Sequence, residues 1–325
     1  MPNERAATAI ATSELRRTFK GRRGTLEAVA GIDLEVHHGE IFGFLGPNGA
    51  GKTTTLRMLA TLLPPTSGEA QVAGEDLLRH PDRVRRKIGY VGQVGGASPD
   101  VTGRSELVFE ARLYGTDPAT ARRRAQELIT GLDLEVCADR KVKTYSGGQR
   151  RRLDMGIGLV HRPELLFLDE PTTGLDPQSR ARMWEEVARL REAGTTVFLT
   201  THYLEEADAL CDRLAIIDHG RIVARGTPDQ LKREVAGDVI TFGVRGEVGT
   251  ALELVRSEPW VKEASVDGET VRLYVDRGET AAPSLLRLLD SQGLELLTLS
   301  LSRPSLDDVF LRQTGRSLRE SGPAA

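Results

Sequence analysis

One stretch of nine residues constrains the fold more than any other part of the chain. It reads Gly-Pro-Asn-Gly-Ala-Gly-Lys-Thr-Thr, follows the apolar run 41–45 and precedes a segment with helical spacing. A strand, a glycine-rich loop and a helix in this order predict a phosphate-binding loop, because the glycines let backbone N–H groups turn toward phosphate oxygens and the helix points its positive end at them. Lys52 would place a positive charge at the β- and γ-phosphates, and the Thr53 hydroxyl would bind Mg²⁺. The predicted nucleotide-binding residues are Gly46, Pro47, Asn48, Gly49, Ala50, Gly51, Lys52, Thr53 and Thr54.

The composition limits the class of protein. The chain has 325 residues, 39% of them hydrophobic, which is enough for one large domain or two ordinary ones. A formal charge of -3 argues against a dedicated nucleic-acid binder, so we expect no nucleic-acid partner. No apolar run approaches the roughly 18–20 residues that span a bilayer, and residues 1–12 lack the pattern of a signal peptide. Cys137 and Cys211 have no metal-binding spacing, and we expect buried, reduced thiols in a cytoplasmic protein.

Two segments flank the predicted nucleotide core. Residues 7–45 alternate apolar and polar in short runs and predict an antiparallel sheet. Phe19 ends the first of these strands. An aromatic ring there is suited to stacking on adenine, although its position alone favours an ordinary core or surface phenylalanine. The second segment, about 95–160, predicts an inserted helical subdomain.

Local signals within this insert mark a helix start and two basic clusters. Asp117 followed by Pro118 is typical of a helix N-terminus. The arginine clusters 122–124 and 150–152 are interpreted as solvated faces of helices.

Two carboxylates end a buried strand. The apolar run 165–168 leads directly into Asp169 and Glu170. An acid at the end of such a strand can hold Mg²⁺ through its water shell, which is the role that we assign to Asp169. The next acid, Glu170, is then placed to orient or deprotonate an attacking water. The alternative is two solvated acids in a loop, and the phosphate loop earlier in the chain argues against it.

Two more polar residues follow predicted core strands. Gln93 comes after the strand 88–91 and is either a solvated residue or a ligand near the γ-phosphate and Mg²⁺. His202 stands at the end of the strand 195–201. A lone histidine is more often structural than catalytic. Ligands of open α/β sheets bind at the carboxyl edge of parallel strands, however, and this favours a catalytic role for His202.

A second anion-binding arrangement precedes the predicted helix 150–160. Residues 145–149 read Tyr-Ser-Gly-Gly-Gln. A serine and two glycines at a helix N-terminus offer backbone N–H groups to an anion, although Ser146 is equally suited to be a plain N-cap. Because one chain carries two phosphate-binding helix ends, we expect two chains to complete each site.

The pattern changes near residue 236. Segments in the order β-α-β-β-α-β predict a small α+β domain over 236–325, of the ferredoxin-like kind. Ser305 and Asp308 predict the start of a last helix, and Gly315 its end. No catalytic constellation is found there, so we interpret this accessory domain as a packing or docking module.

Together these motifs resemble the ATP-binding subunits of ABC transporters, over residues of about 7–235. The phosphate loop, Gln93, the signature 145–149, the carboxylate pair and His202 stand in that family's order. The resemblance implies ATP as the nucleotide, Mg²⁺ as its metal, and hydrolysis coupled to transport. It also implies an α/β fold, with a P-loop NTPase core, an antiparallel β subdomain and a helical insert.

The resemblance assigns roles to single residues. Phe19 would stack on adenine, where the family more often has tyrosine. Glu170 would act on the attacking water and His202 would contact the γ-phosphate. The implied metal ligands are Thr53, Gln93 and Asp169, and the implied catalytic residues are Glu170, His202 and Gln93.

The resemblance also implies a second copy of the chain, in a head-to-tail dimer that encloses ATP. Asp176 would communicate across that interface. Tyr145 departs from the family, which commonly has leucine there, and the glycine-rich stretch 94–98 departs in a way that we expect to affect coupling to a membrane subunit. The residues that would contact the partner's ATP are Ser146, Gly147, Gly148 and Gln149.

The segment 305–315 resembles the tail of daunorubicin-resistance exporter ATPases. It implies export of a drug or antibiotic through a polytopic membrane permease subunit, with this chain on the cytoplasmic face of the cell membrane. One alternative is a soluble ABC-type ATPase that acts on DNA or ribosomes, but this chain has neither two cassettes nor long coiled coils. Another is a regulator that binds nucleotide without turnover, which the presence of both Glu170 and His202 disfavours.

Overall fold

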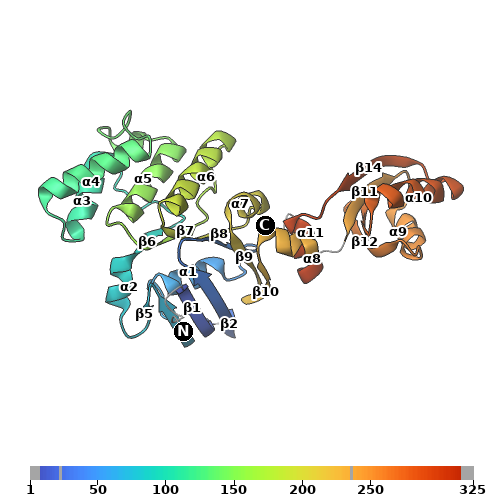
Figure 1. The fold of residues 1–325 in the computed structure, drawn as a ribbon, viewed down its shortest axis with the longest axis horizontal. Coiled ribbons are helices and arrows are strands. Elements are labelled where there is room, and N and C mark those ends of the chain that lie inside the picture. The colour runs from blue at the N-terminus through green and yellow to red at the C-terminus, as the bar shows by residue number, and fades with distance from the viewer. Residues whose placement is uncertain (1–7, 22–23, 235–236, 316–325) are drawn as a thin grey trace. The chain divides into compact units, whose positions relative to one another are not determined.

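The computed structural model describes residues 8–21, 24–234 and 237–315. The chain divides into two compact units between Pro228 and Asp229. The first unit contains an antiparallel sheet, a largely parallel sheet and a group of helices, and the second contains one small sheet with its own helices (Figure 1). Within the described residues, no helix is long and apolar enough to cross a membrane.

The centre of the first unit is a six-stranded sheet with the order β10-β9-β3-β8-β7-β6. Neighbouring strands pair in parallel except β10, which is antiparallel to β9. Three strands, β3, β7 and β8, are buried along their whole length, which explains why each contains an apolar run rather than an alternation of apolar and polar residues. The strands are β3 (Ile41–Leu45), β6 (Ile88–Val91), β7 (Leu165–Asp169), β8 (Thr196–Thr201), β9 (Arg213–Asp218) and β10 (Arg221–Gly226).

Helices pack against this sheet. α1 contacts β7 and β8, α6 and α7 contact β8, and α2 contacts β6. Phe198 lies at the centre of the core, with the rings of Phe42, Phe44 and Phe167 within 5.8 Å of its centroid. The helices are α1 (Lys52–Leu59), α2 (Pro81–Lys87), α6 (Pro177–Glu192) and α7 (Leu204–Leu210).

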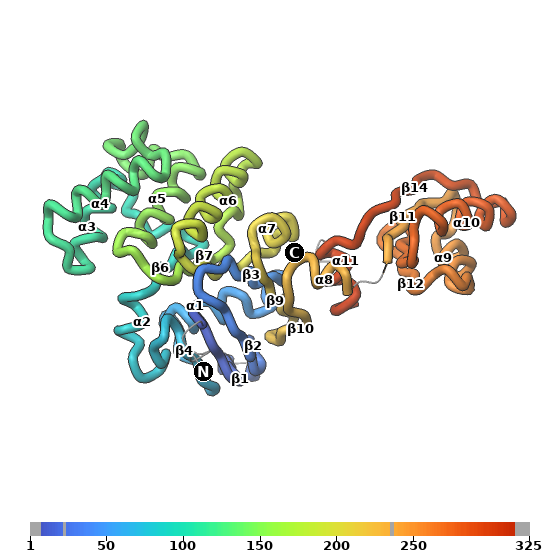
Figure 2. Tube along the Cα trace, in the orientation of Figure 1, coloured from blue at the N-terminus to red at the C-terminus, as the bar shows by residue number. Residues whose placement is uncertain are grey.

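The predicted antiparallel sheet is confirmed. Its order is β2-β1-β4-β5, and β1, β2 and β4 lie side by side in Figure 2. Its inward residues, such as Ile10 and Val29, belong to the same apolar core as Phe42 of the central sheet and Leu56 of α1. The strands are β1 (Thr8–Gly21), β2 (Gly24–His37), β4 (Ser67–Val72) and β5 (Glu75–Asp76).

The helical insert is also confirmed. α3 and α4 lie side by side, with α5 next to α3 (Figure 1). Asp117 accepts hydrogen bonds from two N–H groups of the first turn of α4, and Pro118 occupies its first position, as the sequence predicts. The elements are α3 (Gly103–Leu113), α4 (Pro118–Gly131), the short 3₁₀ turn η2 (Val142–Thr144) and α5 (Gly147–Leu159).

The second unit is an α+β domain with its own core. Its sheet has the order β12-β13-β11-β14, all pairs antiparallel, which is the connectivity of a ferredoxin-like unit. Asp308 and Ser305 form the predicted capping box, and Gly315 ends the last helix at φ 75°. The elements are α8 (Pro228–Glu234), β11 (Asp238–Val244), α9 (Val248–Arg256), β12 (Val261–Asp267), β13 (Thr270–Val275), α10 (Gly278–Ser291), β14 (Leu296–Ser302) and α11 (Leu306–Thr314).

Candidate ATP-hydrolysis site

The phosphate loop joins β3 to α1 and is held from behind by the β9–β10 turn. A Cβ on Gly46 would lie 2.3 Å from the carbonyl oxygen of Ile217, so only glycine fits there. Gly220 donates its N–H to Ala50 O over 2.9 Å, and its own carbonyl accepts from Ala30 N over 2.9 Å. The phosphate loop is therefore held against β9, and Gly220 in the β9–β10 turn links it to β2.

Lys52 is buried at the start of α1, with 4% of its surface exposed. Its Nζ donates to the carbonyl oxygens of Gly46 and Pro47 over 2.8 and 3.0 Å. It also lies 3.3 Å from Glu170 Oε1. Burial lowers the pKa of Lys52, while the charge of Glu170 opposes that shift. The ammonium group is thus poised between the phosphate loop and a carboxylate.

Asp169, Thr53 and Gln93 converge beside this lysine. Asp169 Oδ1 accepts hydrogen bonds from Thr53 Oγ1 over 3.0 Å and from Thr200 Oγ1 over 2.7 Å. Gln93 Nε2 donates to Thr53 Oγ1 over 3.5 Å. Asp169 is fully buried, and its Oδ2 has no hydrogen-bond partner. A buried carboxylate oxygen without a donor, beside a hydroxyl and an amide, fits the oxygen ligands that Mg²⁺ prefers.

Glu170 follows β7 with its carboxylate turned back toward Lys52. Its N–H donates to Thr200 O over 3.1 Å, which fixes the backbone. Oε1 lies 3.3 Å from His202 Nδ1, and Oε2 accepts from Thr173 Oγ1 over 3.3 Å. Burial alone would raise the pKa of Glu170, but His202 and Lys52 outweigh it and bring that pKa down to about 2. The carboxylate is therefore ionised at neutral pH.

The structure brings six of the predicted site residues together at one edge of the central sheet. Their side chains come from the carboxyl ends of β6, β7 and β8 and from the start of α1, which is where open α/β sheets bind ligands. The six are Lys52, Thr53, Gln93, Asp169, Glu170 and His202.

The signature residues lie at the N-terminus of α5 and contact a different loop. Ser146 Oγ accepts from Gln149 N, and Gln149 Oε1 accepts from Ser146 N, a complete capping box. A Cβ on Gly148 would lie 2.7 Å from the hydroxyl of Ser179, in the first turn of α6. Asp176 caps that turn by accepting from Ser179 N and Oγ over 2.9 and 2.7 Å. The signature and the Asp176 loop therefore touch.

Phe19 lies on β1 and is 37% exposed. The guanidinium of Arg17 sits over its ring, 4.7 Å from the centroid. Across the hairpin it pairs with Leu26, which is also exposed. The ring is available for stacking, and its proposed contact with adenine stays a prediction.

The interpretation of residues 150–152 as a solvated face is wrong for two of the three arginines. Arg151 and Arg152 are 8% and 7% exposed. Arg151 donates to three backbone carbonyls near the site, and Arg152 Nη2 donates to Asp133 O over 3.4 Å. The sequence predicts solvated arginines here because the backbone carbonyls that bind Arg151 and Arg152 are distant in the sequence. Only the position of the two residues in a helix with apolar residues at helical spacing indicated that they are buried.

Two further polar residues near the site were not predicted. Thr200 binds Asp169 and the backbone of Glu170. Glu206 of α7 is fully buried and accepts from Thr172 Oγ1 over 2.8 Å and from Trp184 Nε1 over 3.1 Å. Burial raises the pKa of Glu206. A carboxylate two residues into a helix after a core strand was the available signal.

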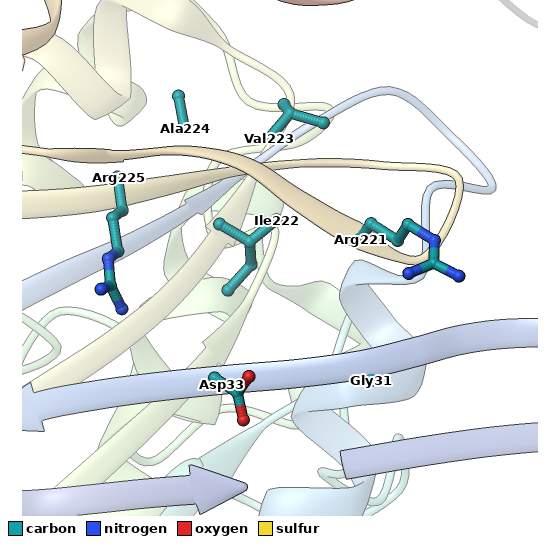
Figure 3. Close-up of a pocket in the computed structure, with 7 residues that line it drawn as sticks. All are labelled: Gly31, Asp33, Arg221, Ile222, Val223, Ala224 and Arg225. Atoms are coloured by element: carbon teal, nitrogen blue, oxygen red, sulfur yellow. The ribbon is translucent and has the colours of Figure 1, made fainter. Parts of the chain in front are cut away.

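A groove of about 450 Å³ lies elsewhere, between β2 and β10. Figure 3 shows Ile222 and Arg225 pointing from β10 toward the strand that carries Gly31 and Asp33. None of the six converging residues lines it, so the candidate site is assigned from the side-chain contacts rather than from this groove.

A phosphate loop, a buried carboxylate pair and a strand-end histidine on this fold, with a signature helix in an insert, define an ATPase of the ABC type. The family profile described as ABC transporter matches residues 29–173, and the profile described as ATP-binding protein DrrA1-3-like, C-terminal domain, matches residues 226–314.

The similarity to relatives extends over nearly the whole chain. The daunorubicin/doxorubicin resistance ATP-binding protein DrrA of Streptomyces peucetius is 46% identical over 96% of this chain and 94% of its own. The linearmycin resistance ATP-binding protein LnrL of Bacillus subtilis is 39% identical over 93% of this chain and 98% of its own. The chain therefore belongs to the ATP-binding proteins of ABC transporters.

A solved ATP-binding cassette has a similar fold. The dimeric post-hydrolysis state of an ATP-binding cassette bound to ADP and Pi superposes with a TM-score of 0.63 at 25% identity. The match covers 67% of this chain and 98% of that one.

Proposed function

We propose that this protein is the ATP-hydrolysing subunit of an exporter, which powers efflux of a drug, antibiotic or other hydrophobic compound through a separate polytopic permease. The observation that carries the proposal is the convergence of Lys52, Asp169, Glu170 and His202 at one sheet edge. The similarity to drug-resistance ATP-binding proteins over both units supports the export of such a compound. The chain would act at the inner, cytoplasmic face of the cell membrane.

The contacts of Lys52 suggest an order of events. The ammonium of Lys52 pairs with Glu170 over 3.3 Å. The phosphates of ATP, bound to the N–H groups of residues 46–53, would compete for that ammonium and release the carboxylate. Glu170 would then accept a proton from the attacking water, and His202 would hold the γ-phosphate. The pKa of Glu170 would rise as the lysine leaves it.

The metal site is part of this proposal. Thr53, Gln93 and Asp169 would hold Mg²⁺, directly or through water. The metal would neutralise charge that develops on the phosphate oxygens. Phe19 would stack on the adenine ring.

The dimer is also proposed. Ser146, Gly147, Gly148 and Gln149 would contact ATP held by the second copy, because a helix N-terminus with free N–H groups suits an anion. Asp176 would carry the state of one site to the other, since its loop touches the signature.

Affinity purification of the tagged full chain from detergent-solubilised native membranes tests the transport role. We expect a polytopic membrane protein in about equal amount, and ATP-dependent phosphate release by the recovered complex. Recovery of ribosomes or DNA-bound complexes with no membrane protein would favour a soluble ABC-type ATPase instead. ATP binding without phosphate release would favour a regulator.

A further inference from the structure

The helix α5 connects two parts of the site that the proposed mechanism treats separately. Its N-terminus carries the signature residues 146–149, which face a partner copy in the proposed dimer. Arg151 lies in the first turns of the same helix and is buried. None of the roles assigned above uses this arginine.

Arg151 holds three backbone carbonyls of the hydrolytic site. Its Nη1 donates to Gly92 O over 2.6 Å, and its Nη2 donates to Asp169 O over 3.1 Å. Its Nε donates to Pro171 O over 2.8 Å. Gly92 directly precedes Gln93, and the other two carbonyls flank Glu170. One planar guanidinium therefore fixes the backbone on which both Gln93 and the carboxylate pair are mounted.

A second side chain of α5 holds the segment on the other side of Gln93. Asp154 Oδ1 accepts the N–H of Gly96 over 3.2 Å. A Cβ on Gly95 would lie 2.6 Å from Asp154 Oδ2, so a larger residue there would displace this carboxylate. Gly95 thus has a steric reason within the glycine-rich stretch, whereas a Cβ on Gly96 would meet nothing within 4 Å. Gln93 lies between two attachment points on one helix.

We propose that Arg151 is a positioning residue that transmits engagement of the signature by the partner's nucleotide to the hydrolytic carboxylates of its own chain. The inference rests on the proposed function. When the N-terminus of α5 is drawn onto a phosphate, the helix moves as a rigid body and the carbonyls held by Arg151 move with it. Binding of ATP to the partner copy would thereby position Glu170 in the site of the chain that carries Arg151.

The test compares Arg151→Lys with Arg150→Lys and Arg152→Lys in the full chain. Lysine keeps the charge but cannot span three carbonyls in one plane. We expect Arg151→Lys to lower kcat about tenfold or more while KM for ATP stays within about twofold, because only the arrangement of the reacting groups is disturbed. The two neighbouring variants, which keep these carbonyls bound, should stay within about twofold of wild type in both constants.

Chemical rescue separates positioning from folding. Guanidinium chloride at millimolar concentration should restore part of the turnover of Arg151→Ala and leave Arg150→Ala unchanged. Wild-type kcat in Arg151→Lys would overturn the proposal. So would an equal loss of kcat and ATP affinity in Arg151→Ala that guanidinium does not restore.

Amide hydrogen exchange gives a readout that does not depend on turnover. Without nucleotide, residues 92–96 and 169–173 should exchange faster in Arg151→Lys than in Arg150→Lys. Equal exchange in the two variants would overturn the role of Arg151. A wild-type chain that binds ATP without hydrolysing it would reject the proposed function instead, and the exchange experiment would still decide the role of the arginine.

Discussion

At the scale of single residues, the backbone of Glu170 carries a conformation that residues with a Cβ rarely adopt. Its φ is 47°, in the left-handed region. Such a residue typically costs about 1–3 kcal/mol and persists only where its surroundings fix it. Hydrogen bonds from its N–H to Thr200 fix it here, and they turn the carboxylate toward Lys52 and His202. The strained backbone therefore belongs to the residue whose carboxylate the proposed chemistry needs.

Glu170→Gln should nearly abolish hydrolysis and retain ATP. Loss of a general base typically costs about 10²–10⁴ in rate, and the neutral amide keeps the shape of the side chain. Phosphate release and light scattering with ATP would measure the loss and the expected persistent dimer. Glu164→Gln, at an exposed residue directly before β7, is the matched control. Normal turnover by Glu170→Gln would exclude this residue as the base.

Asp169→Asn should raise the Mg²⁺ concentration needed for half-maximal hydrolysis by about tenfold or more, because a buried carboxylate is replaced by a neutral amide. A magnesium titration at fixed ATP measures it, with Asp82→Asn on the exposed surface of α2 as control. Chelation with EDTA should stop the wild-type reaction. An unchanged magnesium requirement in Asp169→Asn would remove Asp169 from the ligand set.

At the scale of elements, the turn between β9 and β10 acts on the phosphate loop that it braces. Gly220 has φ 75°, and a Cβ there would lie 2.9 Å from Ala28 O. Gly220→Ala should therefore displace the loop and weaken ATP binding by about tenfold. Gly74→Ala is a matched control, since Gly74 has φ 76° with nothing within 4 Å of a Cβ. It should lose stability, by about 1 kcal/mol, but keep its ATP affinity. Equal affinities in the two variants would contradict the bracing role.

The tyrosine that opens the signature requires a partner glycine on α3. A Cβ on Gly103 would lie 2.3 Å from Tyr145 Oη, which itself donates to Cys137 O over 2.7 Å. Gly103→Ala should cost about 1–3 kcal/mol in urea unfolding, and Tyr145→Phe in the same chain should recover part of it. Gly131→Ala, with nothing within 4 Å, should be close to neutral. Purely additive effects of Gly103→Ala and Tyr145→Phe would show that the two sites do not interact.

How well the sequence predicted each element follows from the range of the forces involved. Strands such as 165–169 and the helix after Asp117 were predicted because their signals, apolar runs and caps, are local. The converging residues were predicted in position because their strands end at one edge. The buried state of Arg151 was missed, since its carbonyl partners near residues 92 and 170 become neighbours only after folding. The fit of Gly103 to Tyr145 was missed for the same reason.

At the scale of the whole molecule, the described residues include an apolar core in each of the two units. One includes Phe42 and Phe198, and the other includes Phe242 and Leu273. In the second unit, the edge strand β14 exposes Leu297, Leu299 and Leu301. Because each unit has its own core, we expect a ligand of one unit to stabilise that unit against unfolding without stabilising the other.

Calorimetry of the full chain should therefore show two unfolding transitions. Only the transition of the first unit should rise with ATP and Mg²⁺, by a shift that corresponds to about 2.7 kcal/mol at a ligand concentration of 100 times Kd. The truncated chain 1–228 should reproduce the ATP-sensitive transition. A single transition that ATP raises as a whole would show that the units unfold together.

The pairing of Lys52 with Glu170 has a consequence for the selection of the nucleotide. On the proposed roles, Glu170 is paired with the same ammonium group that the phosphates of ATP would bind. Small phosphate esters that bind the phosphate loop without reaching Lys52 would leave the ion pair of Lys52 and Glu170 intact. Selectivity for a triphosphate would then follow from the mechanism, because Glu170 could act as the base only after a ligand has drawn Lys52 away from it.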